Sequence, residues 1–419
     1  MHQVQLALGT HHNRVDDSSP QQRAAFEIGW DHAHHGLVPE PGLLLADNPI
    51  GQGWLAGRAV FGGRTLSSTH FTRQWLQWRT LAWRNHQDFD KEQLSPNFLQ
   101  QIQAARCPAS LQWLQGLPGR TDSLVLERLN PAAGFVAGNV VQMSQAAAQA
   151  WQGLTVMDLV RRARAQEQRV HTDTCSPDAP TQQAQERVQE RVQGRMQGQS
   201  QAQPSPDSAH FWWRLATLRA FATPLPFAEA ARLPLAVLPP NRVRLLNAVQ
   251  GLQALLSLNF MKPGWASRCS GLGKHLPEHS LRQDFNLFIG AMAPRVIEAG
   301  SDSAALRSAL ENAWCQERVQ RRWTHLVLSL GERGTEALLQ QAASADLAGK
   351  RTLYLSEAQA IDGWGLAHPK AAAQGSAAPR RALPLPPGLR PRPAHRPKTA
   401  GSRPAPGSDG SAHRPGAAM

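Results

Sequence analysis

The stretch Asp122-Ser-Leu-Val-Leu-Glu-Arg-Leu-Asn-Pro-Ala-Ala-Gly-Phe-Val-Ala-Gly-Asn-Val-Val-Gln-Met-Ser144 contains two apolar runs joined by a turn sequence. Residues 124–129 and 135–143 are rich in large and β-branched apolar side chains, which favour β-strands. Between the two runs, Pro131 presets the backbone angle φ of a turn and Gly134 tolerates a positive φ. The pattern therefore predicts a β-hairpin.

A helix is expected directly after this hairpin. Ser144 is a residue type that favours the N-cap position, and the alanine-rich run after it continues to Leu154. Two strands followed by a helix form a ββα unit. Elsewhere the apolar residues mostly recur at helical spacing, as in residues 242–258. The sequence therefore predicts an α+β fold that is predominantly helical.

Over residues 107–152 the chain resembles the ββα unit of the HNH (His-Me finger) nucleases of phages and mobile elements. Cys107-Pro108 matches the start of the family pattern, and Leu126-Glu127-Arg128-Leu129-Asn130 stands where the family has Leu-Asp-Arg-Ile-Asp. Gly134-Phe135 and Gly138-Asn139-Val140 match the second strand. The resemblance implies a fold that binds DNA or RNA, with Glu127, Arg128 and Asn139 at the catalytic positions.

Cleavage by that family needs one divalent metal ion and a base that activates water. Hard oxygen ligands suit magnesium or manganese, so Asp122 and Glu127 are the candidate metal ligands, with Asn139 as a further oxygen donor. The unit itself contains no His, so the base would have to come from elsewhere in the chain, such as His70 or His86.

The chain also departs from the family pattern. Glu127 replaces the usual Asp, and Arg128 stands where the fuller motif has its His. Alanines occupy positions 147 and 148, where the closing Asn is expected, and no second Cys follows Cys107 at the spacing of a zinc knuckle. These departures favour a unit that binds nucleic acid over one that cuts it.

Residues 69–86 show the clearest helical pattern, with aromatic residues along one face and arginines around it. Basic residues interleaved with aromatic ones can bind a nucleic-acid backbone and stack on bases. Together with the hairpin, this pattern predicts a nucleic-acid-binding set of Arg73, Trp75, Arg79, Arg84 and Arg128. The alternative, which helical periodicity favours, is that the tryptophans pack in a core and the arginines form a solvated face.

Residues 23–62 predict two helices joined by a loop, and they resemble the ribosome modulation factors. The match consists of Gly29, Ala33, Gly36, Pro49, Trp54 and Gly57. This resemblance implies contact with ribosomal RNA. Because small residues at such spacing recur in unrelated helical hairpins, the alternative of a packed hairpin that supports its neighbour is favoured.

The chain is strongly basic, with 44 Lys and Arg against 31 Asp and Glu, a net charge of +13. Such a balance favours polyanionic partners, of which nucleic acid is the default candidate. Residues 369–419 hold nine Lys or Arg and one acid, Asp409, so this segment alone contributes +8. The basic excess is therefore mainly a property of the C-terminal segment.

Cysteine spacing and hydropathy bear on the compartment. The four cysteines lie far apart and lack the spacing of metal ligands, which suits reduced thiols. No apolar run approaches the length of a membrane span. We therefore expect a cytoplasmic protein with no membrane partner.

Composition divides the chain into four segments: 1–165, 166–208, 209–366 and 367–419. Residues 166–208 are rich in Gln and Arg with an imperfect Gln-Glu-Arg-Val repeat, and residues 367–419 are rich in Pro, Arg and Ala. Both compositions predict disorder, because too few apolar residues are present to bury a core. Residues 209–366 predict a separate, mainly helical domain of unreadable function, with an alternating run at 323–330 that suggests a strand.

Three functions follow from these patterns. The first is a nucleic-acid-binding protein whose HNH-like unit has residual nuclease activity or has lost it. The second is a ribosome-associated regulator that uses the N-terminal hairpin and exposes a basic face on it. The third is a non-catalytic interaction protein.

Overall fold

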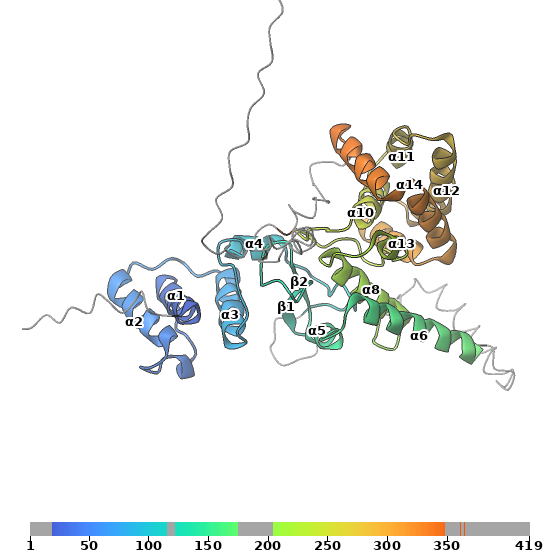
Figure 1. The fold of residues 1–419 in the computed structure, drawn as a ribbon. Coiled ribbons are helices and arrows are strands. Elements are labelled where there is room, and N and C mark those ends of the chain that lie inside the picture. The colour runs from blue at the N-terminus through green and yellow to red at the C-terminus, as the bar shows by residue number, and fades with distance from the viewer. Residues whose placement is uncertain (1–18, 115–121, 175–203, 348–360, 362–363, 365–419) are drawn as a thin grey trace, which may run out of the picture. The chain divides into compact units, whose positions relative to one another are not determined.

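The computed structural model describes residues 19–114, 122–174, 204–347, 361 and 364. The described part is mostly helical and contains one two-stranded sheet, which confirms the predominantly helical α+β class (Figure 1). By contacts the chain divides into Met1–His368 and Pro369–Met419, and all of the second unit lies outside the described residues. No helix among the described residues has the length and hydrophobicity that crossing a bilayer requires.

The N-terminal part consists of helices. Their bounds are α1 Pro20–His34, η1 Pro41–Leu43, α2 Pro49–Phe61, α3 His70–Arg84 and α4 Pro96–Gln101. The predicted helical hairpin corresponds to α1 and α2. Its two helices approach so closely that a Cβ added at Gly53 would lie 1.9 Å from the Phe26 carbonyl oxygen. Glycine is therefore required where the two backbones touch.

The sheet pairs β1 Leu124–Arg128 with β2 Val140–Ser144 in antiparallel register, with Leu124 opposite Ser144 and Arg128 opposite Val140. Helix α5, Gln145–Ala150, follows at once, and its first turn is capped by Ser144, whose Oγ accepts a hydrogen bond from the N–H of Ala147. The chain thus runs strand, strand, helix here, and α5 ends at Ala150 instead of continuing to the predicted Leu154.

The predicted second strand is wrong at residues 135–139. Phe135 pairs instead with a segment before the hairpin: its N–H donates to the Asp88 carbonyl, and its own carbonyl accepts from the Asp90 N–H. Gly138 has φ of +90°, which breaks an extended strand. Pairing with β1 therefore begins only at Val140.

The remaining helices are α6 Val156–Thr174, α8 Ala209–Phe221, α9 Phe227–Ala230, α10 Ala248–Phe260, α11 Trp265–Gly273, α12 His279–Ala299, α13 Ser303–Trp314 and α14 Glu317–Ser344. Helix α6 continues past the predicted boundary at residue 165, while residues 175–203 of the predicted linker lie outside the described part. The suggested strand at 323–330 is wrong. It lies within α14, where Val319, Trp323 and Val327 are buried at helical spacing.

One hydrophobic cluster contains residues from both sides of the predicted linker, among them Trp151 and Leu159 with Phe211 and Trp213. Hydrogen bonds join the same parts, since the Asn130 side-chain amide donates to the Ala222 carbonyl at 2.9 Å. The predicted split between 1–165 and 209–366 is therefore not marked by a gap in the core. It stays a prediction.

Candidate nucleic-acid interface

The turn between β1 and β2 is held by Asn139, which is fully buried. Its Oδ1 accepts a hydrogen bond from the Asn130 N–H at 2.8 Å, and its Nδ2 donates to the carbonyls of Asn130 and Gly134, both at 3.0 Å. Both amide hydrogens and the carbonyl oxygen of this side chain are thus engaged. The structure gives Asn139 a role in shaping the turn.

Asn139→Ala is expected to lower the free energy of unfolding by about 2 kcal/mol, because the buried N–H and carbonyl of Asn130 and the partly buried carbonyl of Gly134 lose this partner. The measurement is equilibrium denaturation of the full chain. Asn286→Ala is the matched control, because Asn286 is exposed on α12. Equal stability of the two variants would contradict this role.

Arg128 also serves the turn. Its guanidinium donates to the carbonyls of Pro131 and Ala133, both at 3.1 Å, and lies 5.3 Å above the Phe135 ring. Arg128 stands where the HNH motif has its His, and its side chain folds back onto the hairpin.

Glu127 lies on β1 beside Arg128 and is half-buried. Burial raises the pKa of the Glu127 carboxyl above its ordinary value, and the charges of Arg128 and Arg219 oppose this rise. Among the described residues, no histidine is one of the groups that act on its charge.

The described residues contain no group of three or more His, Cys, Asp or Glu arranged to hold a metal ion. Asp122 precedes β1 and is partly buried. In the described part, Asp122 and Glu127, the predicted metal ligands, thus do not belong to a group that includes a third His, Cys, Asp or Glu side chain.

Helix α3 carries four of the residues that the sequence predicts to bind nucleic acid, and two of them, Trp75 and Arg79, are buried. Trp75 is 7% exposed and packs in a core with Leu76 and Trp78. The Arg79 side chain is also buried; it pairs with Asp31 at 2.6 Å and stacks 4.3 Å from the Trp75 ring. Trp75 and Arg79 both lie inside the fold, so neither side chain is presented at the surface of α3.

Two arginines of that set remain at the surface. Arg73 is exposed, and Arg84 is partly exposed and pairs with Glu40 at 2.5 Å. A surface ion pair of this kind is weak and exchanges readily for another anion. These two side chains remain candidates for peripheral contacts.

A cleft of about 2180 Å³ adjoins the hairpin. Its walls come from the loop before β1, from β2, and from segments around residues 237–243 and 295–316. Five arginines and two glutamates line it: Arg106, Arg214, Arg242, Arg295, Arg307, Glu298 and Glu311. Glu311 is buried and already paired with Arg214 and Arg307. The cleft is therefore net basic.

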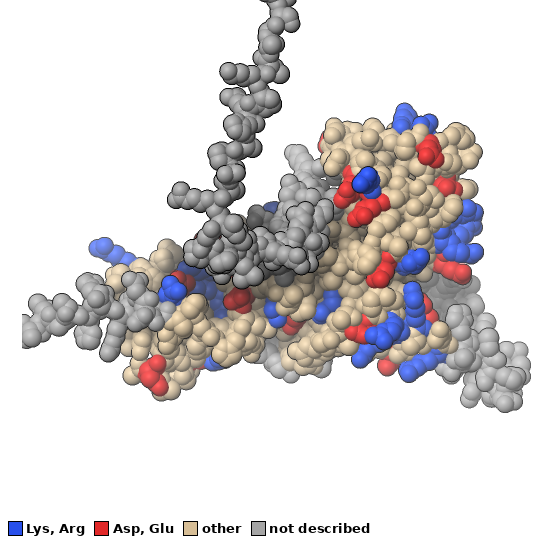
Figure 2. Space-filling view, viewed as in Figure 1, with Lys and Arg blue, Asp and Glu red and all other residues tan. Residues whose placement is uncertain are grey.

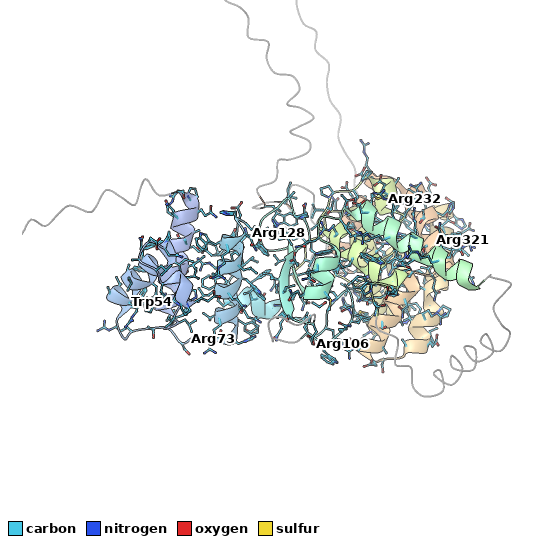
Figure 3. All side chains as sticks on the ribbon, turned by 90° about the horizontal axis from the view of Figure 1, so that it is seen from below. Trp54, Arg73, Arg106, Arg128, Arg232 and Arg321 are labelled. Carbon is cyan, nitrogen blue, oxygen red and sulfur yellow. The ribbon has the colours of Figure 1, made fainter. Side chains whose placement is uncertain are left out.

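The cleft lies apart from the turn clamped by Arg128. Figure 3 shows Arg106 and Arg128 on opposite sides of the β1–β2 hairpin. The Arg244 N–H donates to the Gly138 carbonyl at 3.1 Å, which ties the hairpin to the residue that follows the cleft residues Arg242 and Val243. Arg242 itself is exposed, with a positive φ of 65°. The sequence did not identify the cleft arginines, because no local pattern joins segments so far apart in the chain.

Basic side chains also gather outside the cleft. Figure 2 shows a group of them over α6, where Arg161, Arg162 and Arg164 are exposed. Positive charge is therefore not confined to one place, and a test of the cleft needs arginine controls elsewhere on the surface.

Comparison with protein families, with characterised proteins and with solved structures found no match for this chain.

Proposed function

We propose that this protein binds nucleic acid in the arginine-lined cleft and that the β1–β2 hairpin frames the cleft without cutting the bound strand. The observation that carries the proposal is that five arginines and two glutamates line one large cleft. Arg214 and Arg307 pair with Glu311, and Arg295 pairs with Glu298, which leaves the lining with an excess of three positive charges. Arginine side chains suit phosphate groups because their planar donors match phosphate oxygens.

Cleft size supports a polymer over a small metabolite. Pockets for small molecules usually have volumes of roughly 300–1,000 Å³. The cleft is about 2180 Å³, and three of its arginines, Arg106, Arg242 and Arg295, are exposed along it. A row of basic side chains in an open groove follows a sugar–phosphate backbone.

Binding without cleavage follows from the hairpin residues. Asn139 and Arg128 are engaged in the turn. The half-buried Glu127 has two arginines acting on its charge. These engagements tie two residues at the catalytic positions of the HNH-like pattern to the hairpin itself, which supports binding over cutting.

The ribosome proposal receives no support from the charge of the hairpin. Residues 20–65 contain three arginines and four acids, so this segment has no net positive charge. Ribosomal RNA is nevertheless a suitable probe, because the binding titration described below can compare its affinity with those of other RNA and DNA strands.

The expected result concerns the double variant Arg242→Gln/Arg295→Gln in the full chain. It should bind labelled DNA or RNA roughly tenfold or more weakly at low salt, and the slope of log affinity against log salt should fall by about 2, because two phosphate contacts are lost. Titration by fluorescence anisotropy at several salt concentrations measures both quantities.

The matched control is Arg232→Gln/Arg321→Gln, which removes two exposed arginines away from the cleft (Figure 3). This control keeps the affinity of the wild type and has the same net charge as the cleft variant. An equal loss of affinity in both variants would show that binding depends on the overall charge of the protein, and it would overturn the proposal that the cleft is the binding site. Cleavage with magnesium or manganese that disappears in Glu127→Ala would overturn the non-cutting hairpin.

A further inference from the structure

The loop before β1 presents two side chains to the cleft in a fixed geometry. Arg106 and Trp113 face each other across an antiparallel bridge. Hydrogen bonds on both sides hold this bridge: the Cys107 N–H donates to the Gln112 carbonyl at 2.8 Å, and the Leu114 N–H donates to the Ala105 carbonyl at 3.0 Å. The backbone that carries the pair is therefore ordered.

The turn that closes this loop is held in an unusual conformation. Leu111 has a positive φ of 59°, a region that side chains other than glycine rarely adopt, and its N–H donates to the Cys107 carbonyl at 2.8 Å. Cys107 is fully buried, which anchors the start of the turn in the core. Packing thus stabilises a turn that places Trp113 opposite Arg106.

The two side chains stack. The guanidinium carbon of Arg106 lies 4.4 Å from the centroid of the Trp113 ring. Both residues line the cleft, and Trp113 is 58% exposed. All thirteen tryptophans of the chain are among the described residues, and Trp113 is the single one of them that is largely exposed. A large aromatic surface is therefore presented to the cleft where the others are wholly or partly buried.

We infer that Arg106 and Trp113 form a stacking platform that makes the cleft prefer single-stranded nucleic acid. This inference rests on the proposed function. The guanidinium covers one part of the indole and orients it, and a nucleobase stacks on the exposed part. Arg242 and Arg295, on other walls of the same cleft, bind phosphates of the same strand.

The preference for single strands has a physical basis. Aromatic side chains bind unpaired bases through their flat faces, whichever base is present. In a duplex those faces are covered by the neighbouring base pairs, so a platform inside a cleft has nothing to stack on. The arginines alone would bind both forms through phosphates, without distinguishing them.

Trp113→Ala in the full chain tests the platform. Its affinity for a labelled single strand of about twelve nucleotides, a length within the usual site sizes, should fall roughly fivefold to a hundredfold. Its affinity for a duplex of the same sequence should stay unchanged, so the preference for single strands disappears. Trp113→Phe should keep most of the single-strand affinity, because a smaller aromatic ring remains.

An abasic single strand of the same length separates stacking from charge. Wild type should bind this abasic strand as weakly as Trp113→Ala does, and the variant should not distinguish the abasic strand from the normal one. Arg58→Gln is the matched control for Arg106→Gln, because Arg58 also stacks on a tryptophan, Trp54, at 4.9 Å, and lies on α2 away from the cleft. Only Arg106→Gln should weaken single-strand binding.

The outcomes separate the inference from the proposed function. If Trp113→Ala, with an unchanged thermal midpoint, keeps the single-strand preference while Arg242→Gln/Arg295→Gln loses affinity, the platform is overturned and the basic cleft stands. If neither variant changes binding, both are overturned. Equal binding of abasic and normal strands by wild type also overturns the platform.

Discussion

Glu311→Gln is expected to lower the free energy of unfolding by about 3–5 kcal/mol, the usual cost of removing one partner from a buried ion pair. Glu311 is 3% exposed, and its Oε2 accepts from Arg214 at 2.8 Å. Its Oε1 accepts from the Leu238 N–H at 2.9 Å and from Arg307 at 3.1 Å. A neutral amide would leave the buried Arg214 without a compensating charge.

The other described hydrogen-bond partners of Arg214 do not replace that carboxylate. His210 lies 3.4 Å from Arg214, and burial lowers its pKa to about 4, so it is neutral at pH 7. Arg214 also donates to the carbonyls of Pro108 and Ala236, which offer dipoles but no charge. The guanidinium therefore depends on Glu311.

Chemical denaturation of the full chain, followed by far-ultraviolet circular dichroism, measures the effect. Glu298→Gln is the matched control, because Glu298 pairs with Arg295 at 2.9 Å with both side chains largely exposed. Its cost should be below about 1 kcal/mol. If Glu311→Gln costs no more than Glu298→Gln, the buried ion pair does not stabilise the fold more than the exposed one.

Gly53→Ala is expected to lower the free energy of unfolding by about 3 kcal/mol, because the added methyl group has no room between two backbones. A Cβ at Gly53 would lie 1.9 Å from the Phe26 carbonyl oxygen, and one at Gly29 would lie 1.9 Å from the Ile50 carbonyl oxygen. These contacts are with backbone, so no side chain can move aside to accommodate the methyl group.

Hydrogen exchange of α1 and α2, together with thermal unfolding, reports the loss. Gly42→Ala is the control, because a Cβ at that position meets nothing within 4 Å. Wild-type protection of α1 and α2 in Gly53→Ala would show that the two helices do not need this close approach.

Local patterns in the sequence determined much of the fold. Ser144 caps α5 as its residue type predicts, since a short polar side chain satisfies the free N–H groups of the first turn. Leu124–Arg128 forms β1, and the helical hairpin forms where small residues recur. Each of these signals acts between residues close in the chain.

Other local patterns were ambiguous because two packings satisfy the same residues. Phe135 belongs to an apolar run that suits a strand, but it pairs with residues 88–90 instead of β1. The tryptophans of α3 suit either a core or a stacking surface, and neighbours from other segments bury Trp75 while Asp31 neutralises Arg79. A partner distant in sequence decides such cases.

The sequence by itself therefore determined the helical class, the β1–β2 hairpin and its capped helix, because propensity, turn chemistry and capping act over a few residues. Only the tertiary structure decided what surrounds them. It turned Asn139 and Arg128 inward to hold a turn. It also brought Arg106, Trp113, Arg242 and Arg295 to one cleft. Sequence patterns over a few residues do not predict these contacts, because the contacts depend on which distant segments pack against one another.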